Sequence, residues 1–117
     1  MDIGGMRYYP KQIVFGSHIW DIKFTNSLKR RLGASDFHGW CDEENSTIWI
    51  LKGLSPLETF ITFLHEVMHC WESEGDFEID HDSIFKIEKW MARFLIDNCD
   101  DVAGIVCSSQ NKKRKTA

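Results

Sequence analysis

Two histidines and a glutamate, His65, Glu66 and His69, are the residues whose types and spacing best suit chemistry. Residues four apart lie one above the other on a helix, so the imidazoles of His65 and His69 can both reach one metal ion at the zinc–nitrogen distance of about 2.0–2.1 Å. Glu66 projects from the edge of the same face and can reach a water molecule held by that ion. The pattern predicts a zinc site in which Glu66 is the general base.

A third protein ligand is expected downstream, because a catalytic zinc ion usually takes three and leaves one position open. His81 lies at the predicted start of the next helix, from which an imidazole can swing toward the first helix. Glu88 lies two helical turns further on, on the same face as His81. We favour His81 as the ligand. Glu88 is the alternative ligand, or a partner that orients a ligating histidine.

The zinc motif falls inside a segment with clear helix signals. Ser55 is a favourable N-cap, Pro56 suits the first helical position, and Glu58 completes a capping box. Apolar residues then recur at helical spacing, namely Leu57, Phe60, Ile61, Leu64, Val67, Met68 and Trp71. We expect Gly75 to end this helix.

A second helix is predicted to begin near Asp80 or Asp82, either of which can cap it, and to close around residues 97–98. Beyond Gly104 the chain turns polar, and we expect residues 105–117 to form a disordered basic tail. Residues 1–104 then make a single domain, because the chain is too short for two independent cores.

Three short strands are predicted before the helices. Apolar and charged residues alternate from Trp20 to Phe24, and residues 37–41 and 47–51 are two further apolar segments joined by a polar hairpin loop. Residues 1–17 are only weakly patterned. The gaps between consecutive strands are too short for parallel crossovers, so we predict an α+β fold in which a small antiparallel sheet packs on the zinc-motif helix and a second C-terminal helix.

The charges of the chain are unevenly distributed. Lys112, Lys113, Arg114 and Lys115 are basic, and without them 10 basic residues face 18 acidic ones, a net charge of −8. This acidic body argues against a broad nucleic-acid-binding surface, and the four basic residues allow only a weak contact with nucleic acid. Acidic residues also recur from residue 72 to residue 82, where they either favour basic substrates or form a solvated loop.

The cysteines and the hydropathy exclude other classes of protein. The four cysteines form no Cys-x-x-Cys pair, which argues against a zinc ribbon. Cys70 follows His69 and points about 100° away from it on a helix, so we expect a small core residue. Neither a membrane-spanning apolar run nor a signal-peptide pattern is evident, so we expect a cytoplasmic protein without a membrane partner.

A family resemblance rests on residues 65–91, which read HEVMHCWESEGDFEIDHDSIFKIEKWM. This segment resembles the active-site half of SprT-like zinc metallopeptidases, which carry a third histidine one loop after the motif and an aromatic residue four positions later, as in His81 and Phe85. It is also similar to minimal phage-type gluzincin-like proteins, in which a glutamate is the third ligand. Asp82 departs from the SprT-like pattern, which usually has glycine there, and the zinc ribbon and DNA-binding parts of larger members have no counterpart.

The resemblance implies a minimal zincin fold and a peptide or protein substrate. In zincins an edge strand before the active-site helix binds an extended peptide by main-chain pairing, which would assign substrate binding to Ile48, Trp49 and Ile50. The other interpretation is that these three residues are core on both faces of the sheet. We therefore predict a zinc-dependent metallopeptidase. The alternative is a catalytically silent, zinc-stabilised binding or regulatory module on the same scaffold, with a possible association with nucleic acid.

Overall fold

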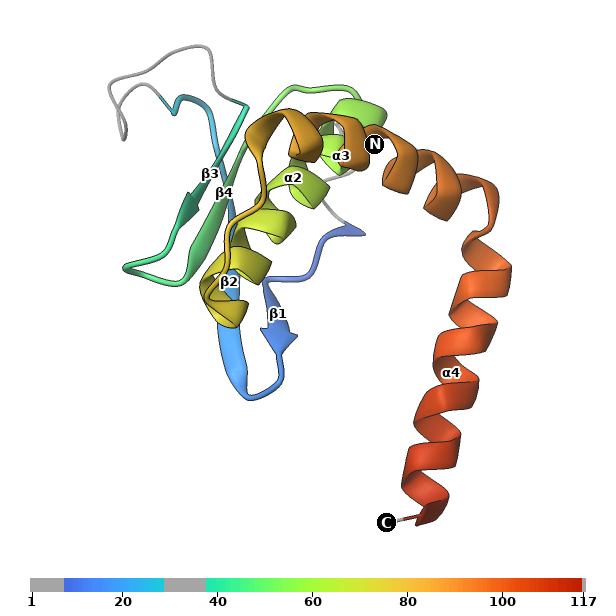
Figure 1. Ribbon diagram of the computed structural model, residues 1–117. Helices are drawn as coiled ribbons and strands as arrows, with labels where there is room; N and C mark the ends of the chain where they lie inside the picture. The colour runs from blue at the N-terminus through green and yellow to red at the C-terminus, as the bar shows by residue number, and fades with distance from the viewer. Residues whose placement is uncertain (1–7, 29–37, 117) are drawn as a thin grey trace.

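The protein is a small α+β domain, described by a computed structural model over residues 8–28 and 38–116, with side chains through residue 110. Within the described residues, four strands precede three helices (Figure 1). The strands are β1 (Gln12–Phe15), β2 (His18–Thr25), β3 (Gly39–Asp42) and β4 (Thr47–Leu51), and the helices are α2 (Pro56–Gly75), α3 (His81–Asp97) and α4 (Cys99–Thr116).

The sheet is mixed, so the prediction of a purely antiparallel sheet is wrong. Its strand order is β1-β2-β4-β3, in which β2 and β4 run parallel and the two outer pairs run antiparallel. A parallel pair needs a connection of about a dozen residues or more. The gaps between consecutive strands are short, but β3 is formed within the connection from β2 to β4, which makes that connection long enough.

The edge strand β1 was not expected from the sequence. It pairs with β2 through a tight turn at Gly16, whose φ of +63° suits glycine. The other three strands were predicted close to their observed bounds, and the β3–β4 hairpin is confirmed. The polar and basic residues 26–31 also favour a turn or short helix; residues 29–31 of that segment, and Phe37 at the start of the second predicted strand, lie outside the described residues.

The core lies between the sheet and α2, which crosses one face of it (Figure 1). Its buried members come from both central strands and from the helix, and they are Trp20, Ile22, Ile48, Ile50 and Cys70. The alternation along β2 turns Trp20 and Ile22 into this core. Cys70 is fully buried, as expected of a small core residue.

Helix α2 begins as the sequence predicts. The Ser55 hydroxyl accepts a hydrogen bond from the Glu58 amide, and the Glu58 carboxylate accepts one from the Ser55 amide, which completes the capping box. The helix ends at Gly75, and Asp76 continues in the left-handed conformation with φ of +54°. A well-capped helix therefore fixes the zinc motif in its middle.

Helix α3 packs beside α2, and α4 leads away from the domain (Figure 1). Asp80 caps α3, whose end at Asp97 and Asn98 agrees with the sequence prediction. The chain remains helical from Cys99 to Thr116, in contrast to the disorder expected from residue 105. Asp100 and Asp101 in the first turn of α4 favour the helix through its dipole. No helix of the described part is both long and apolar enough to cross a membrane.

Candidate metal centre

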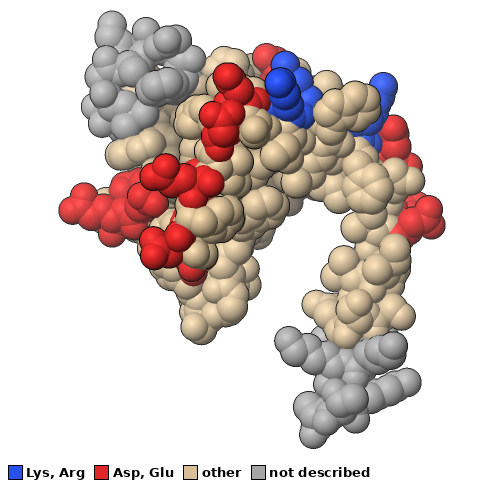
Figure 2. All heavy atoms as spheres, viewed as in Figure 1, with Lys and Arg blue, Asp and Glu red and all other residues tan. Residues whose placement is uncertain are grey.

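The central turns of α2 present the zinc motif to a cavity of about 310 Å³ between α2, β3 and the start of α3. The cavity is lined by Gly39, Trp40, Cys41, Glu43, His65, Glu66, His69, Glu72 and His81. Acidic side chains gather around the β3–β4 turn and the last turns of α2 on the face shown in Figure 2. We define the candidate metal centre as His65, His69 and His81 with Glu66, Glu72 and Glu88, of which all but Glu88 line this cavity.

The rings of His65 and His69 direct the same kind of nitrogen at each other. Their Nε2 atoms are 3.2 Å apart, and the ring centroids are 4.9 Å apart. Two nitrogens that each lie about 2.0–2.1 Å from a tetrahedral zinc ion are roughly 3.3–3.4 Å apart. The pair therefore already has nearly the separation that a shared zinc ion requires.

The other nitrogen of each ring faces a carboxylate. His65 Nδ1 lies 3.2 Å from Glu88 Oε2, and His69 Nδ1 lies 2.6 Å from Glu72 Oε1. When each Nδ1 donates its hydrogen to its carboxylate, each neutral ring presents an Nε2 lone pair to the other. Such opposed lone pairs suit a cation between them, and carboxylates behind the ligating histidines are the usual support of a zinc site.

His81 is better placed than Glu88 to complete the set. The His81 ring centroid is 5.2 Å from that of His69 and 6.0 Å from that of His65. Since an imidazole centroid lies roughly 1.2 Å behind its ligating nitrogen, three rings on a tetrahedral zinc ion would be roughly 5.2 Å apart. Glu88 instead contacts the Nδ1 side of His65, away from the facing Nε2 pair.

A third side chain does not lie in ligating position beside the two facing imidazoles of the described residues. Among the residues whose side chains are described, no three His, Cys, Asp or Glu form a group arranged to hold a metal ion. His81 is exposed at the first position of α3, so its ring can turn without displacing core atoms. The preformed part of the site is thus the pair of motif histidines, and His81 would complete it by a change of rotamer.

Glu66 is held in a dry environment. It is 5% exposed, and burial together with the nearby Glu88 raises its pKa from 4.5 to about 8. Strand β3 approaches it so closely that a Cβ added to Gly39 would lie 2.9 Å from Glu66 Oε2 and 2.7 Å from Thr62 Cγ2. Glycine at position 39 therefore provides the space in which the Glu66 carboxyl reaches the cavity.

The neighbouring groups titrate differently because their surroundings differ. Burial, and then the charges of His69 and His81, lower the pKa of His65 to about 4, which keeps its ring neutral at pH 7. Burial raises the pKa of Glu88 to about 7. Burial also acts to raise the pKa of Glu72, but hydrogen bonds from the Ile79 amide and His69 outweigh it, so the pKa of Glu72 is lowered.

The substrate-binding residues proposed from the sequence require a correction. Strand β4 lies between β2 and β3 and is not an edge strand. Ile48 and Ile50 are fully buried in the core, and Trp49 is half-buried, so these residues do not offer a free main chain to a peptide. The edge strand beside the cavity is β3, which the sequence order alone could not distinguish from β4.

Two features of the site were missed in the sequence. Glu72 is a helical residue three positions after His69, and this spacing on one helix face is the signal that could have identified it as a partner of that histidine. Gly39 gave no signal, because its role depends on how closely β3 approaches α2. The basic residues Lys112–Lys115 have side chains outside the described part, so their contact with nucleic acid stays a prediction.

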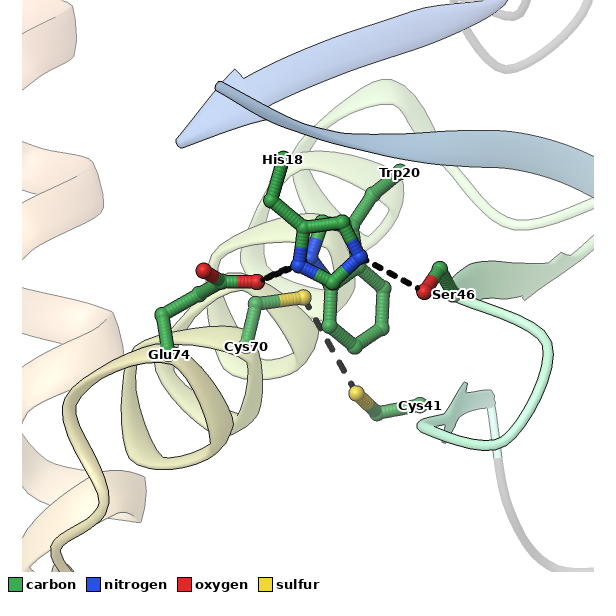
Figure 3. A network of polar contacts seen from close by, with 6 residues as sticks. All are labelled: His18, Trp20, Cys41, Ser46, Cys70 and Glu74. Carbon is green, nitrogen blue, oxygen red and sulfur yellow. Dashed lines mark hydrogen bonds and ion pairs between the residues drawn. The ribbon is translucent and has the colours of Figure 1, made fainter. Parts of the chain in front are cut away.

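A separate polar group, the His18 cluster, lies at the last turn of α2 (Figure 3). His18 Nδ1 contacts Glu74, and His18 Nε2 lies 2.8 Å from the Ser46 hydroxyl. Trp20 Nε1 also donates to Glu74, at 2.8 Å. We define the cluster as His18, Trp20, Ser46 and Glu74, and it joins the β1–β2 turn, the β3–β4 turn and α2.

Comparisons of this chain with known proteins found no significant match. No family model matches the sequence, and neither a curated protein nor a solved structure is significantly similar to it. The functional argument therefore rests on the residues of this chain.

Proposed function

We propose that the protein is a zinc-dependent metallopeptidase in which His65, His69 and His81 hold the metal and Glu66 is the catalytic base. The observation that carries the proposal is the 3.2 Å separation of two histidine Nε2 atoms whose Nδ1 atoms both face carboxylates. Nitrogen donors in this arrangement suit zinc, and they leave a coordination position for water or substrate.

Zinc bound there would polarise the scissile carbonyl and lower the pKa of a water molecule. Glu66 would take a proton from the attacking water and deliver it to the leaving amine nitrogen. A raised pKa near 8 in the metal-free protein makes this carboxyl a stronger base than an exposed glutamate, and the positive charge of a metal would favour its ionised form. Glu88 and Glu72 would hold the ligating rings in position.

The substrate that fits this cavity is an extended peptide. Strand β3 is an edge strand that lines the cavity with Gly39, Trp40 and Cys41, so its outer main chain could pair with a peptide strand next to Glu66. Glu43 and Glu72, which line the cavity, would favour basic residues in that peptide. The resemblance of residues 65–91 to SprT-like enzymes agrees with such a substrate and carries no weight beyond that.

The test is the substitution Glu66→Gln in the zinc-loaded protein, assayed on a mixture of peptides by mass spectrometry. Removing the base should lower the cleavage rate by roughly 100- to 10,000-fold, whereas the zinc content should stay near that of the wild type. Glu78→Gln is the matched control, because Glu78 is exposed in the loop between α2 and α3. Cleavage by Glu66→Gln at the wild-type rate would exclude this mechanism.

A second function, a zinc-stabilised module without turnover, is favoured by the burial of Glu66. A carboxyl that is 5% exposed and mostly protonated at pH 7 is poorly placed to take a proton from water unless a cation ionises it. Such a module would bind zinc with the same histidines, lose stability on chelation and cleave no peptide in the same mixture. If the wild type cleaves peptides and Glu66→Gln does not, the protein is a peptidase and not a silent zinc-binding module.

A further inference from the structure

Two thiols meet beside the candidate metal centre. Cys41 on β3 and Cys70 on α2 point at each other in Figure 3, and their Sγ atoms are 3.8 Å apart. Both cysteines are reduced. The contact joins the edge strand of the sheet to the helix turn that directly follows His69.

The two thiols differ in their access to solvent. Cys70 is fully buried in the core cluster with Trp20 and Ile48. Cys41 is half-buried and lines the cavity of the candidate metal centre. A small molecule that enters the cavity can therefore reach Cys41, whereas Cys70 is shielded from solvent.

We propose that Cys41 is a site of oxidative modification by hydroperoxides and that Cys70 converts the product into a disulfide. The Cys41 sulfur attacks the peroxide, the O–O bond breaks, and Cys41 becomes a sulfenic acid with release of water or an alcohol. The Cys70 sulfur then attacks the Cys41 sulfur, and the sulfenic oxygen leaves as water with the Cys70 proton. Two thiols are oxidised in total, and one hydroperoxide is reduced.

The geometry requires only a small closure. A disulfide has an S–S distance of about 2.05 Å, so the two sulfurs must approach by roughly 1.8 Å. The two thiols already face each other across the β3–α2 contact (Figure 3). The exposed Cys99 and Cys107 lie on α4, away from this pair, and are not needed for the reaction.

The disulfide would fix the wall of the cavity. Cys41 lies two residues after Gly39, where an added Cβ would clash with Glu66, and Cys70 lies next to His69. A covalent link at this point restrains how far β3 can move from α2. The reaction itself does not depend on the proposed peptidase activity, since it is followed without a peptide substrate.

The experiment uses the reduced full-length chain with Cys99→Ser and Cys107→Ser, so that only the pair remains. Hydrogen peroxide is added in steps, the free thiols are blocked in denaturant, and the intact mass and the linked peptides are measured. The expected result is the joint loss of both thiols in a monomer that is lighter by two hydrogen atoms, with a peptide that links Cys41 to Cys70. Reduction with dithiothreitol should restore both thiols.

Two further variants separate the oxidation of Cys41 from the formation of the disulfide. With Cys70→Ser added, the same treatment should leave Cys41 as a sulfenic acid that dimedone labels, and with Cys41→Ser added the buried Cys70 should stay unmodified. Oxidation of Cys41 to the sulfinic or sulfonic acid while Cys70 stays free would overturn the proposal. A disulfide found only between two chains would overturn it as well.

Discussion

Histidine–glutamate pairs occur in two regions of this molecule, and they differ in what the second ring nitrogen does. In the candidate metal centre, His65 and His69 each face a carboxylate through Nδ1 and point Nε2 at each other. In the His18 cluster, Nδ1 faces Glu74 in the same way, but Nε2 is already taken by the Ser46 hydroxyl. A histidine with both nitrogens in use has no lone pair to offer a metal ion.

The carboxylates of the two regions also differ in their surroundings, which shift their pKa values in opposite directions. Hydrogen bonds from Trp20 and His18 lower the pKa of Glu74, which is the behaviour of a satisfied surface carboxylate. Burial raises the pKa of Glu66 and Glu88, which have fewer partners to stabilise their charge. A His–Glu pair alone is therefore no sign of a metal site. The sign is a pair of such rings with convergent free nitrogens next to a buried carboxyl.

The residue types of a hydrolytic serine–histidine–acid triad are also present in Ser46, His18 and Glu74. Its histidine is 46% exposed, and its glutamate is shared with the indole of Trp20, so the cluster lacks the enclosed setting in which such a triad works. We interpret it as a tie between the two β-turns and the end of α2.

The largest expected difference between the two regions is in zinc binding. Replacement of His65 or His69 by alanine removes one of the two convergent nitrogens and should lower zinc affinity by roughly 1,000-fold or more. His18→Ala removes the histidine of the His18 cluster instead and should leave the zinc affinity unchanged. Competition with a chromophoric chelator measures both. Equal affinities for His65→Ala and His18→Ala would remove the distinction on which the site depends.

The sequence predicted the motif region well because its signals are local. The capping box, the helical spacing of apolar residues and the four-residue spacing of the histidines all lie within one helix, where sequence distance translates directly into position. Asp80 and Asn98 bound α3 for the same reason. The observed Nε2 pair is thus a direct consequence of spacing.

The sequence could not predict relations between elements. The parallel pairing of β2 with β4 makes β4 central and β3 the edge, and it depends on a long connection that contains another strand. The nearness of Gly39 to Glu66 and of Cys41 to Cys70 follows from that same arrangement. The contact between Glu88 and His65 depends on how α3 packs on α2, so the sequence left open whether Glu88 is an alternative ligand or a partner that orients a histidine.

A second difference should appear in the pH dependence of stability in the chelated protein. The pKa of Glu66 is raised on folding from 4.5 to about 8, so the folded state binds its proton more tightly than the unfolded state does. The stabilisation of the folded state by this proton is fully present below about pH 4.5 and is lost as the pH rises through about 8. The free energy of unfolding of the wild type should therefore fall by roughly 2–4 kcal/mol across this range relative to Glu66→Gln.

The His18 cluster should respond with the opposite sign. Because the pKa of Glu74 is lowered on folding, its contribution is present above the usual pKa and is lost as the pH falls through the lowered value. Glu74→Gln should then differ from the wild type in its pH profile only under acid conditions. Urea titrations from pH 3 to pH 9 measure both variants. A wild-type curve parallel to that of Glu66→Gln between pH 6.5 and 8.5 would show that Glu66 is not held protonated.

The smallest expected effect concerns the carboxylates that face the Nδ1 atoms of His65 and His69. Glu72→Gln and Glu88→Gln keep the size of the side chain and remove its charge, so zinc affinity should fall by roughly 10- to 100-fold. Glu74→Gln, the same change in the His18 cluster, should have no effect on zinc affinity. The chelator competition used for the histidine variants gives all three values at pH 7.

The two supporting carboxylates should also differ from each other. The pKa of Glu72 is lowered, so its charge is present at pH 7 before zinc binds, and the substitution removes all of its benefit. The pKa of Glu88 is about 7, so zinc must displace a proton from roughly half of the molecules, and the loss on substitution is smaller. The affinity ratio of wild type to Glu88→Gln should therefore grow between pH 6 and pH 8, while the ratio for Glu72→Gln stays constant. If the Glu88→Gln ratio were flat with pH, the carboxyl would not be coupled to the metal through His65.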